Sequence, residues 1–302
     1  MKNIKILYII GNGFDLHHKL ASSYWDFMQF IKQEDESLYN LVEEYLQIED
    51  NWSDFEDAFA SIDVYSLTEY ASIFLKSYGA DDWRDSAHHD YQYEIEQVVT
   101  HLSIMLKQYF IAWLKQLNVS RKKLLELQKS AQYLTFNYTK TLQCTYQIAN
   151  KNILHIHGSI KHPQNIILGH AWKPKSNQYV GELFEVSDTE VRILEGNEIL
   201  EEYFLQTFKP SRKIIKKNQI FFRSLHAVRT VYVLGHSISD IDVEYFCAIV
   251  KSTNLRKVQW IVSYHDKNDK INYKKKFQNI GIPRSNIKLI KLSKLKRKKS
   301  YE

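Results

Sequence analysis

The strongest constraint on the fold is a set of short apolar runs, each of which stops at a glycine or an asparagine. The run "IKILYII" at 4–10 stops at Gly11, and "QYLTF" at 132–136 stops at Asn137. Short runs rich in branched residues and bounded by turn residues are typical of buried β-strands. We therefore expect a sheet that is covered on both faces.

Further runs of this kind alternate with stretches of helical spacing. The expected strands are 4–10, 132–136, 152–158, 165–170, 230–237, 258–264 and 286–292, and the expected helices between them lie near 140–149, 212–227, 240–252 and 270–279. Strands that alternate with helices favour a parallel sheet. The predicted fold class is therefore α/β, with a Rossmann-like, mostly parallel sheet.

About a hundred residues between the first two strands have mainly helical spacing. The clearest helix is predicted at 90–118, where apolar residues recur every three or four positions on one stripe: Ile95, Val99, Leu102, Leu106, Phe110, Trp113 and Leu117. No helix–strand unit needs a connection of this length. We therefore expect a Rossmann-like domain at 1–20 and 131–292, a helical insertion at 21–130 and a basic tail at 293–302. The stretch 172–200 has little periodicity and is expected to form a loop excursion or a lid.

Composition limits the class of protein. The chain has 302 residues, 44% of them hydrophobic, enough for one large core that carries an insertion. It lacks both an uncharged apolar run of about 18 residues and a signal-peptide pattern. Cys144 and Cys247 are too few for a disulfide framework or a four-cysteine zinc site. We expect a soluble, reduced, cytoplasmic protein with no membrane association.

The net charge of +6 is concentrated near the carboxyl terminus, in "KLIKLSKLKRKKSYE". A solvated, frayed terminus is the favoured interpretation of this tail. Contact with nucleic acid is the alternative, since Lys and Arg neutralise phosphates.

Ligands bind beyond the carboxyl ends of the strands in open parallel sheets. Polar and glycine residues follow four of the expected strands, so segments far apart in sequence are expected to meet at one crevice. The candidate binding residues are Gly11, Asn12, Gly13, Asp15, Gly158, Gly235, His236, Ser237 and Asp240, and the candidate catalytic residues are Asn137 and His157.

The first loop is a partial match to a dinucleotide fingerprint. Gly11 and Gly13 fit the G-x-G-x-x-G pattern, but Leu16 replaces its third glycine. Two glycines still allow a phosphate or ribose to approach the backbone, so Gly13→Val is expected to block a nucleotide while leaving stability largely intact. Asp15 could accept a hydrogen bond from a ribose hydroxyl or cap the next helix.

His157 stands before a glycine at a strand end, where we expect it to face the crevice. Its ordinary pKa of about 6.5 suits proton transfer near neutrality, and Asn137 could orient a water or a ribose hydroxyl. The alternatives are an Asx turn for Asn137 and loop carbonyl partners for His157.

Two other kinds of site are considered. The histidine pairs His17–His18 and His88–His89 lack a carboxylate or cysteine at convincing ligand spacing, so no metal is expected. A nuclease site could be built from four acidic residues, whose spacing fits a solvated helix face better: Asp54, Glu56, Asp57 and Asp63.

Several motifs together resemble the bacteriophage abortive-infection AbiH family. They are "IGNGFDLHHKL", "NWSDFE", "DDWRDSAHHDYQYEI", "TFNYTKTL", "HIHG" and "GHSISDID". The likeness covers most of the chain, to about residue 250, and implies a role in phage defence. A phage-derived trigger and self-association are the partners that such a role suggests.

That family in turn is similar to the sirtuin-type NAD-binding fold in the order of its strand-end motifs. The similarity implies NAD as substrate, with Asn137 and His157 acting at the nicotinamide ribose and the glycine loops holding the rest of the nucleotide. Thr139 stands where the sirtuin pattern has Asp, and the four zinc cysteines of deacylases are missing. NAD hydrolysis to nicotinamide and ADP-ribose is therefore the implied activity. A nucleotide sensor without turnover and a nucleic-acid-binding or nuclease effector are the alternatives.

Overall fold

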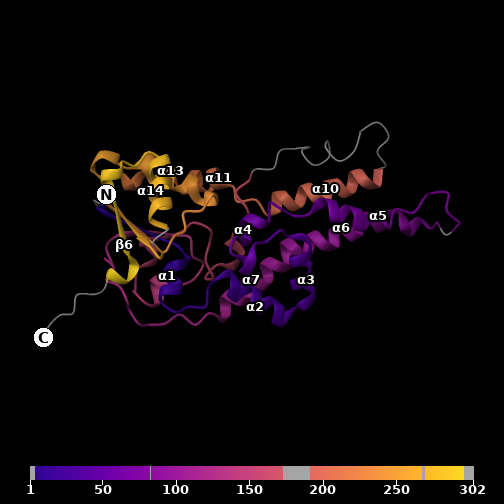
Figure 1. The fold of residues 1–302 in the computed structure, drawn as a ribbon, viewed down its shortest axis with the longest axis horizontal. Helices are drawn as coiled ribbons and strands as arrows, with labels where there is room; N and C mark the ends of the chain where they lie inside the picture. Colours follow the sequence, from indigo (N-terminus) through magenta and orange to yellow (C-terminus); the bar gives the residue numbers. More distant parts are fainter. Residues whose placement is uncertain (1–3, 82, 173–190, 267–268, 296–302) are drawn as a thin grey trace. The chain divides into compact units, whose positions relative to one another are not determined.

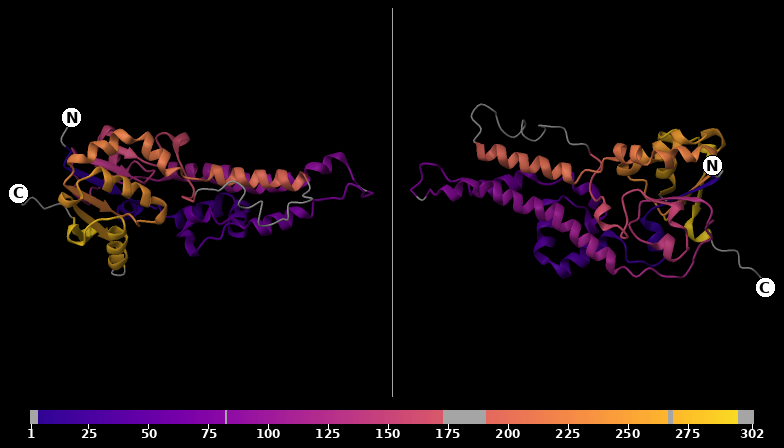
Figure 2. Two further views of the ribbon diagram at one scale, coloured as in Figure 1. Left: turned by 90° about the horizontal axis from the view of Figure 1, so that it is seen from above. Right: turned by 180° about the vertical axis from the view of Figure 1, so that it is seen from behind.

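The computed structural model describes residues 4–81, 83–172, 191–266 and 269–295. The chain forms two compact units, both drawn in Figures 1 and 2. The sheet unit comprises Met1–Ser23, Leu114–Ile167 and Pro210–Glu302. The helical unit comprises Tyr24–Trp113 and Leu168–Lys209. Most of the expected basic tail, from residue 296 on, lies outside the described residues.

One six-stranded sheet forms the centre of the sheet unit, with the order β3-β2-β1-β4-β5-β6 and every neighbouring pair parallel. The strands are β1 (Ile6–Ile10), β2 (Gln132–Thr135), β3 (Ile153–His155), β4 (Thr230–Leu234), β5 (Gln259–Tyr264) and β6 (Ile287–Lys291). The predicted α/β, Rossmann-like class is confirmed.

Helices cover both faces of this sheet. Side chains alternate between the two faces along each strand, so each strand contributes to a core on either side. Leu7 and Ile9 of β1 share a buried cluster with Phe246. Their neighbours Tyr8 and Ile10 belong to a second cluster on the other face, together with residues of the first helix and of segment 124–148. In Figure 1 α1 and α13 lie on opposite sides of the strands. Both faces are therefore buried from solvent, as expected for a sheet of uniformly apolar strands.

The helices of the sheet unit are short. They are α1 (Asn12–His17), α8 (Thr141–Cys144), α11 (Ser211–Lys217), α12 (Gln219–Arg223), α13 (Val243–Ser252) and α14 (Asp269–Asn279). Single 3-10 turns join them: η4 (Asn150–Asn152), η5 (Pro163–Asn165), η6 (Ser224–Ala227), η7 (Asp240–Asp242), η8 (Leu255–Lys257), η9 (Arg284–Asn286) and η10 (Leu292–Lys294).

The helical unit is built from amphipathic helices around an aromatic core. They are α2 (Tyr24–Glu34), α3 (Glu36–Tyr45), η1 (Asp50–Trp52), α4 (Phe55–Ala58), α5 (Val64–Ser72), η2 (Asp85–His89), α6 (Asp90–Thr100), η3 (His101–Met105), α7 (Leu106–Gln116, whose last residues belong to the sheet unit) and α10 (Val191–Gln206). Phe27 is fully buried, and its ring centroid lies 5.1 Å from that of Phe110 and 5.2 Å from that of Trp113. In Figures 1 and 2 α10 runs beside α6.

The helix predicted at 90–118 is confirmed as a continuous rod made of α6, η3 and α7. Its middle segment η3 is a π-helix, a wider turn that inserts one residue without breaking the rod. Ile95, Leu102 and Leu106 are fully buried, as the apolar stripe predicts.

Two expectations from the sequence are wrong. Residues 165–170 form no strand: η5 and a single bridge between His170 and Phe208 take their place. Ile166 is buried and the carbonyl of Ile167 accepts a hydrogen bond from the Tyr138 hydroxyl, so this apolar run anchors a loop. The end of the stretch 172–200 is also not a loop, because α10 begins at Val191. Residues 173–190 lie outside the described residues.

Candidate functional site

The strand order places the first and fourth strands at a topological switch point. β1 is the first strand in sequence, and the chain continues to β2 on one side of it and later to β4 on the other. In open parallel sheets the loops at such a point diverge and leave a crevice at the carboxyl ends of the strands. The loops after β1, β2, β3 and β4 carry all of the site residues predicted from the sequence. All of these residues lie in the sheet unit.

In this protein the glycine loops after β1 and β4 do not diverge at their start but pack directly on each other. The Gly11 N–H donates to the Leu234 carbonyl at 3.1 Å, and the Gly13 N–H donates to the Gly235 carbonyl at 2.7 Å. A Cβ atom on Gly13 would lie 2.9 Å from the Gly235 carbonyl oxygen, and one on Gly11 would lie 2.6 Å from the Cα of His236. Contact between the two loops therefore requires these glycines, whatever binds above them.

One consequence corrects an expectation from the sequence. The atoms nearest to a Cβ on Gly13 are backbone atoms of Gly235, which cannot rotate away. Gly13→Val is therefore expected to lower stability as well as any binding. The prediction that this substitution spares stability is wrong, because the glycine faces protein backbone at the point where an added side chain would stand.

Asp15 is fully buried in α1, immediately after the glycine loop. The Thr139 hydroxyl donates to its Oδ2 at 2.6 Å. Its other oxygen, Oδ1, has no hydrogen-bond partner among the described residues. Burial raises the pKa of Asp15 above its usual 3.8, against the opposite effect of the neighbouring polar side chains of Thr139, Thr141 and Asn137. A buried carboxyl group with an unpartnered oxygen is poised to take a further hydrogen bond or a proton.

Asn137 forms hydrogen bonds at the carboxyl ends of three strands, β1, β2 and β3. Its side-chain amide donates to the Gly11 carbonyl at 3.1 Å, and its backbone N–H donates to the Thr135 hydroxyl at 3.1 Å. Its own carbonyl lies 2.9 Å from Nδ1 of His155, at the end of β3. The Asn137 side chain is buried and is already engaged in the protein.

His157 lies in a buried polar cluster with His236, Asp242 and Tyr245. The side chain of His157 is 3% exposed, so the expectation that it faces an open crevice is wrong. Its Nε2 shares a hydrogen bond with the Tyr245 hydroxyl at 3.2 Å and lies 3.9 Å from Oδ1 of Asp242. The ring of Phe136 packs edge-on against both imidazoles, with centroids 5.4 Å from His157 and 4.4 Å from His236.

Hydrogen bonds fix the tautomer of His236. Its Nδ1 accepts the backbone N–H of Ile238 at 2.8 Å and therefore carries no proton. The neutral ring then bears its proton on Nε2, which lies 3.3 Å from Oδ2 of Asp242. His236 thus presents an N–H to the Asp242 carboxylate, which in turn lies between the two imidazoles.

The backbone of the loop after β4 is strained at Ile238. This residue has φ of 57°, a left-handed conformation that is an outlier for a β-branched side chain. The Ile238 carbonyl accepts a hydrogen bond from the Lys276 ammonium at 2.7 Å, and Ile238 itself is buried. Strain of this kind persists only where the surroundings enforce it, and it concentrates at functional sites.

Four predicted binding residues lie outside these buried contacts. The Asn12 amide is engaged with Ser22, whose carbonyl lies 2.7 Å from Nδ2. Gly158 has φ of 87° and would place a Cβ 2.3 Å from the Asn165 carbonyl oxygen. Ser237 is exposed, and so is Asp240, which lies 3.8 Å from the Lys276 ammonium.

Three residues of the site are not predicted from the sequence. Thr139 hydrogen-bonds Asp15, and Asp242 and Tyr245 lie beside His157. The "SDID" motif contains two aspartates, and the second one, Asp242, faces the histidines. The chain enters η7 and then α13 at this point, and only that turn decides which aspartate points inward. Tyr245 is an ordinary apolar-stripe position in α13 and carries no distinguishing signal.

The arrangement at the carboxyl edge has two chemical capacities. The Asp15 carboxyl can accept a proton or a hydroxyl hydrogen bond. The His157–Asp242–His236 cluster can move a proton between an imidazole and a carboxylate. Among the described residues, no three metal-ligating side chains converge at this edge; the set that does converge comprises His88, His89 and Glu195 of the helical unit. No described helix is long and apolar enough to cross a bilayer.

Comparison with known proteins identifies the family. Residues 7–264 match the model of the family described as bacteriophage abortive infection AbiH. The matched region runs from β1 to β5 and includes Asp15, Asn137 and Thr139 as well as the cluster of His157, His236, Asp242 and Tyr245. A comparison with curated proteins gives no match. The match covers well over half of the chain, and the chain therefore belongs to the bacteriophage abortive infection AbiH family.

Proposed function

We propose that the carboxyl edge of the sheet binds NAD and hydrolyses the bond between nicotinamide and ribose, as the toxic step of a phage-defence response. The observation that carries the proposal is that the loop of Gly11 contacts both Asn137 and His236 at the β1–β4 switch point, with Asp15 directly after this loop and His157 in the cluster of His236. Membership of the AbiH family supports the abortive-infection role. NAD is chosen for the order of strand-end motifs, which is similar to that of sirtuin-type proteins.

The proposed reaction consumes NAD and water and releases nicotinamide, ADP-ribose and a proton. The bond between C1′ of the ribose and the nicotinamide nitrogen breaks, and its electron pair leaves with nicotinamide. The water oxygen forms a new bond to C1′, and its proton passes to a protein base. One such acid–base group contributes about 10²–10⁴-fold, so orientation and electrostatics must supply the remaining rate enhancement.

The residue roles follow from position. Asn137 would orient the water or a ribose hydroxyl, and His157 would accept the proton. In the structure the Asn137 side chain is hydrogen-bonded to the Gly11 carbonyl, and the His157 side chain is hydrogen-bonded to the Tyr245 hydroxyl. Turnover therefore requires a second polar atom of each side chain to reach substrate or water, or an exchange of these hydrogen bonds, and it requires the buried His157 to become accessible.

Those internal hydrogen bonds favour a second candidate function, a nucleotide sensor without turnover. A protein that only binds NAD needs the loops of the carboxyl edge, and it can leave Asn137 and His157 in their structural contacts. Ligand binding would then stabilise one arrangement of the loop after β4, where Ile238 is strained.

Incubation of the purified protein with NAD separates the two functions, with nicotinamide and ADP-ribose as the measured products. If NAD is hydrolysed, Asn137→Ala and His157→Ala are each expected to lower the rate at least about a hundredfold. Because both act on the same ribose, the double variant is expected to be little slower than either single one. Circular dichroism of each variant checks that the sheet unit is still folded.

His162→Ala is the matched control, since His162 is an exposed histidine on the loop that follows Gly158. It is expected to turn over NAD at the wild-type rate. A wild type that hydrolyses NAD equally well after both site substitutions would contradict the proposed roles. A wild type that binds NAD, with a higher melting temperature in its presence, yet releases no nicotinamide would establish the sensor function instead.

A further inference from the structure

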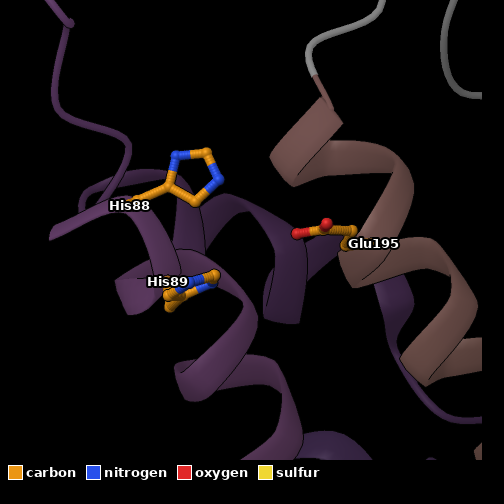
Figure 3. A group of neighbouring side chains, drawn as sticks. All are labelled: His88, His89 and Glu195. Atoms are coloured by element: carbon orange, nitrogen blue, oxygen red, sulfur yellow. The ribbon is translucent and has the colours of Figure 1, made fainter. Parts of the chain in front are cut away.

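Three side chains converge from two segments of the helical unit that are distant in sequence. His88 and His89 end η2, and Glu195 lies in α10. One ligand atom from each residue lies within 4.8 Å of the other two. Figure 3 shows the Glu195 carboxylate pointing toward the two imidazoles, with Nε2 of His88 on the side that faces it. We propose that these residues form a binding site for a divalent transition-metal ion, with Zn²⁺ as the best-fitting ion.

Neighbouring side chains hold two of the three ligands in place. The Gln92 amide donates to Oε2 of Glu195 at 2.6 Å, and Gln92 is buried. Nδ1 of His88 shares a hydrogen bond with the Tyr78 hydroxyl at 3.3 Å. Metal-ligating histidines typically use the second ring nitrogen in such a bond, which fixes the tautomer and the ring orientation. His88 thus has Nε2 available to a metal while Nδ1–H can donate to Tyr78.

The spacing is slightly wider than that of a bound ion. Zn²⁺ holds nitrogen and oxygen ligands at about 2.0–2.2 Å, which places tetrahedral ligands about 3.4 Å apart. The three ligand atoms must therefore move together by roughly 1 Å, a shift within the reach of side-chain rotation. His89 is exposed and can make most of that movement without disturbing the core.

The donor set selects the class of ion. Two imidazoles and one carboxylate suit Zn²⁺ and its transition-metal neighbours, whereas Mg²⁺ and Ca²⁺ prefer oxygen ligands. Three protein ligands leave a coordination position for water. Arg192, one helical turn before Glu195, adds an opposing positive charge, but its guanidinium is stacked over Tyr78 at 4.6 Å and donates to the Lys76 carbonyl at 3.0 Å.

The site would join two parts of the helical unit that are far apart in the chain. His88 and His89 directly precede α6, and Glu195 lies in α10, which packs along α6. A bound ion would therefore fix α10 against α6 near the amino-terminal end of each helix. Stability conferred by a ligand follows its concentration relative to its dissociation constant.

Zinc binding by the full chain tests the proposal. Metal-free protein is titrated with Zn²⁺ alone, and bound metal is counted after gel filtration. The expected result is one Zn²⁺ per chain with a dissociation constant in the micromolar range or tighter. His88→Ala and Glu195→Gln are each expected to weaken binding at least about tenfold. His226→Ala, which removes an exposed histidine of the sheet unit, is expected to bind as the wild type does.

A measurement on the wild type covers the case in which a variant fails to fold. X-ray absorption at the zinc edge should show nitrogen and oxygen neighbours only, with the scattering pattern of two imidazoles. Sulfur ligation, a site without imidazole, or no bound zinc at micromolar concentrations would each overturn the proposal. Wild-type affinity in folded His88→Ala and Glu195→Gln variants would overturn it equally.

Discussion

Asp15 is the side chain at the carboxyl edge whose burial is hardest to explain by folding alone. It accepts one hydrogen bond from Thr139, and its Oδ1 has no partner among the described residues. Removing a carboxylate from water without full compensation lowers stability. A residue kept at such a cost is a strong candidate for ligand contact, because a ribose hydroxyl would satisfy the free oxygen.

Asp15→Asn is expected to stabilise the protein at neutral pH. Burial raises the pKa of Asp15 above its usual 3.8, so the folded form retains a proton that the unfolded chain releases. The stability contributed by this group is complete below pH 3.8 and is lost as the pH rises through the raised pKa. The variant lacks this loss and should be more stable at pH 7 by at least about 0.5 kcal/mol.

Urea denaturation of both proteins between about pH 3.5 and about pH 7.5 checks this prediction. The two unfolding free energies should approach each other at the acidic end and separate as the pH rises. A constant difference across the range would show that Asp15 keeps its ordinary pKa. Loss of NAD binding together with a gain in stability would identify the carboxyl group as functional.

At the residue scale, the site residues that stand directly at strand ends can be predicted from the sequence. Asn137 and His157 are predicted at the carboxyl edge because a parallel sheet brings strand ends together. Asp242 and Tyr245 cannot be predicted as site residues in this way, since their orientation depends on the helical turn that starts α13. Glu195 cannot be paired with His88 from the sequence either, because only the packing of α10 on α6 brings them together.

At the scale of elements, the main feature of the site is the contact between the loops after β1 and β4. Gly235 has φ of 64°, and a Cβ on it would lie 2.1 Å from the backbone nitrogen of Phe14. Gly281, in the turn between α14 and β6, has φ of 92° and no atom within 4 Å of the same position. The two glycines thus share a left-handed backbone but differ in their surroundings.

This pair allows the loop contact to be measured. Gly281→Ala is expected to cost about 1–2 kcal/mol of unfolding free energy, for the left-handed backbone alone. Gly235→Ala should cost about 1–3 kcal/mol more, because it also forces the two loops apart. Equilibrium denaturation gives both values. Equal losses for the two variants would contradict the close packing of the loops.

The helix with the most regular apolar pattern is predicted correctly, whereas a helix that buries polar residues is missed. The rod at 90–118 has an uninterrupted stripe. In α10 the buried face includes Arg192, Gly196 and Asn197, which removes the helical pattern from the sequence. Gly196 is needed there because a Cβ would lie 2.5 Å from the Tyr91 ring. The run at 165–170 has the apolar content of a strand, but none of the described strands pairs with it.

At the scale of the whole molecule, the excess of positive charge lies at the carboxyl terminus. Five basic residues stand between 294 and 299: Lys294, Lys296, Arg297, Lys298 and Lys299. The six strands end before them, at Lys291. The fold class, a parallel sheet with helices on both faces, follows from the sequence because strand runs and helical spacing alternate along the chain.

The sheet does not need the tail, because all six strands are complete before it. Truncation after Ser293, which removes residues 294–302, is therefore expected to leave the fold and any NAD turnover unchanged and to lower the melting temperature by at most a few degrees. Leu295 packs on the sheet unit but is only partly buried, so its loss should cost at most about 1 kcal/mol. A truncated chain that unfolds well below the wild-type melting temperature would contradict this prediction.

Binding of the full chain and of the truncated chain to DNA and RNA, measured at several salt concentrations, completes this test. Each phosphate contact that is lost should reduce the slope of log affinity against log salt by about 0.7–0.9. Strong, salt-dependent binding that disappears with the tail would favour the nucleic-acid effector over the NAD hydrolase.

The position of β1 in the sheet has a consequence for synthesis on the ribosome. β1 is made first, yet its partners come much later: Ile10 pairs with Thr135 of β2 and with Leu234 of β4. At about 5–20 residues per second, β2 follows after roughly 6–25 s and β4 after roughly 11–45 s. During that interval an apolar strand with both edges unpaired is open to association with other nascent chains. The yield of folded protein in the cell should therefore depend on how quickly translation reaches the fourth strand.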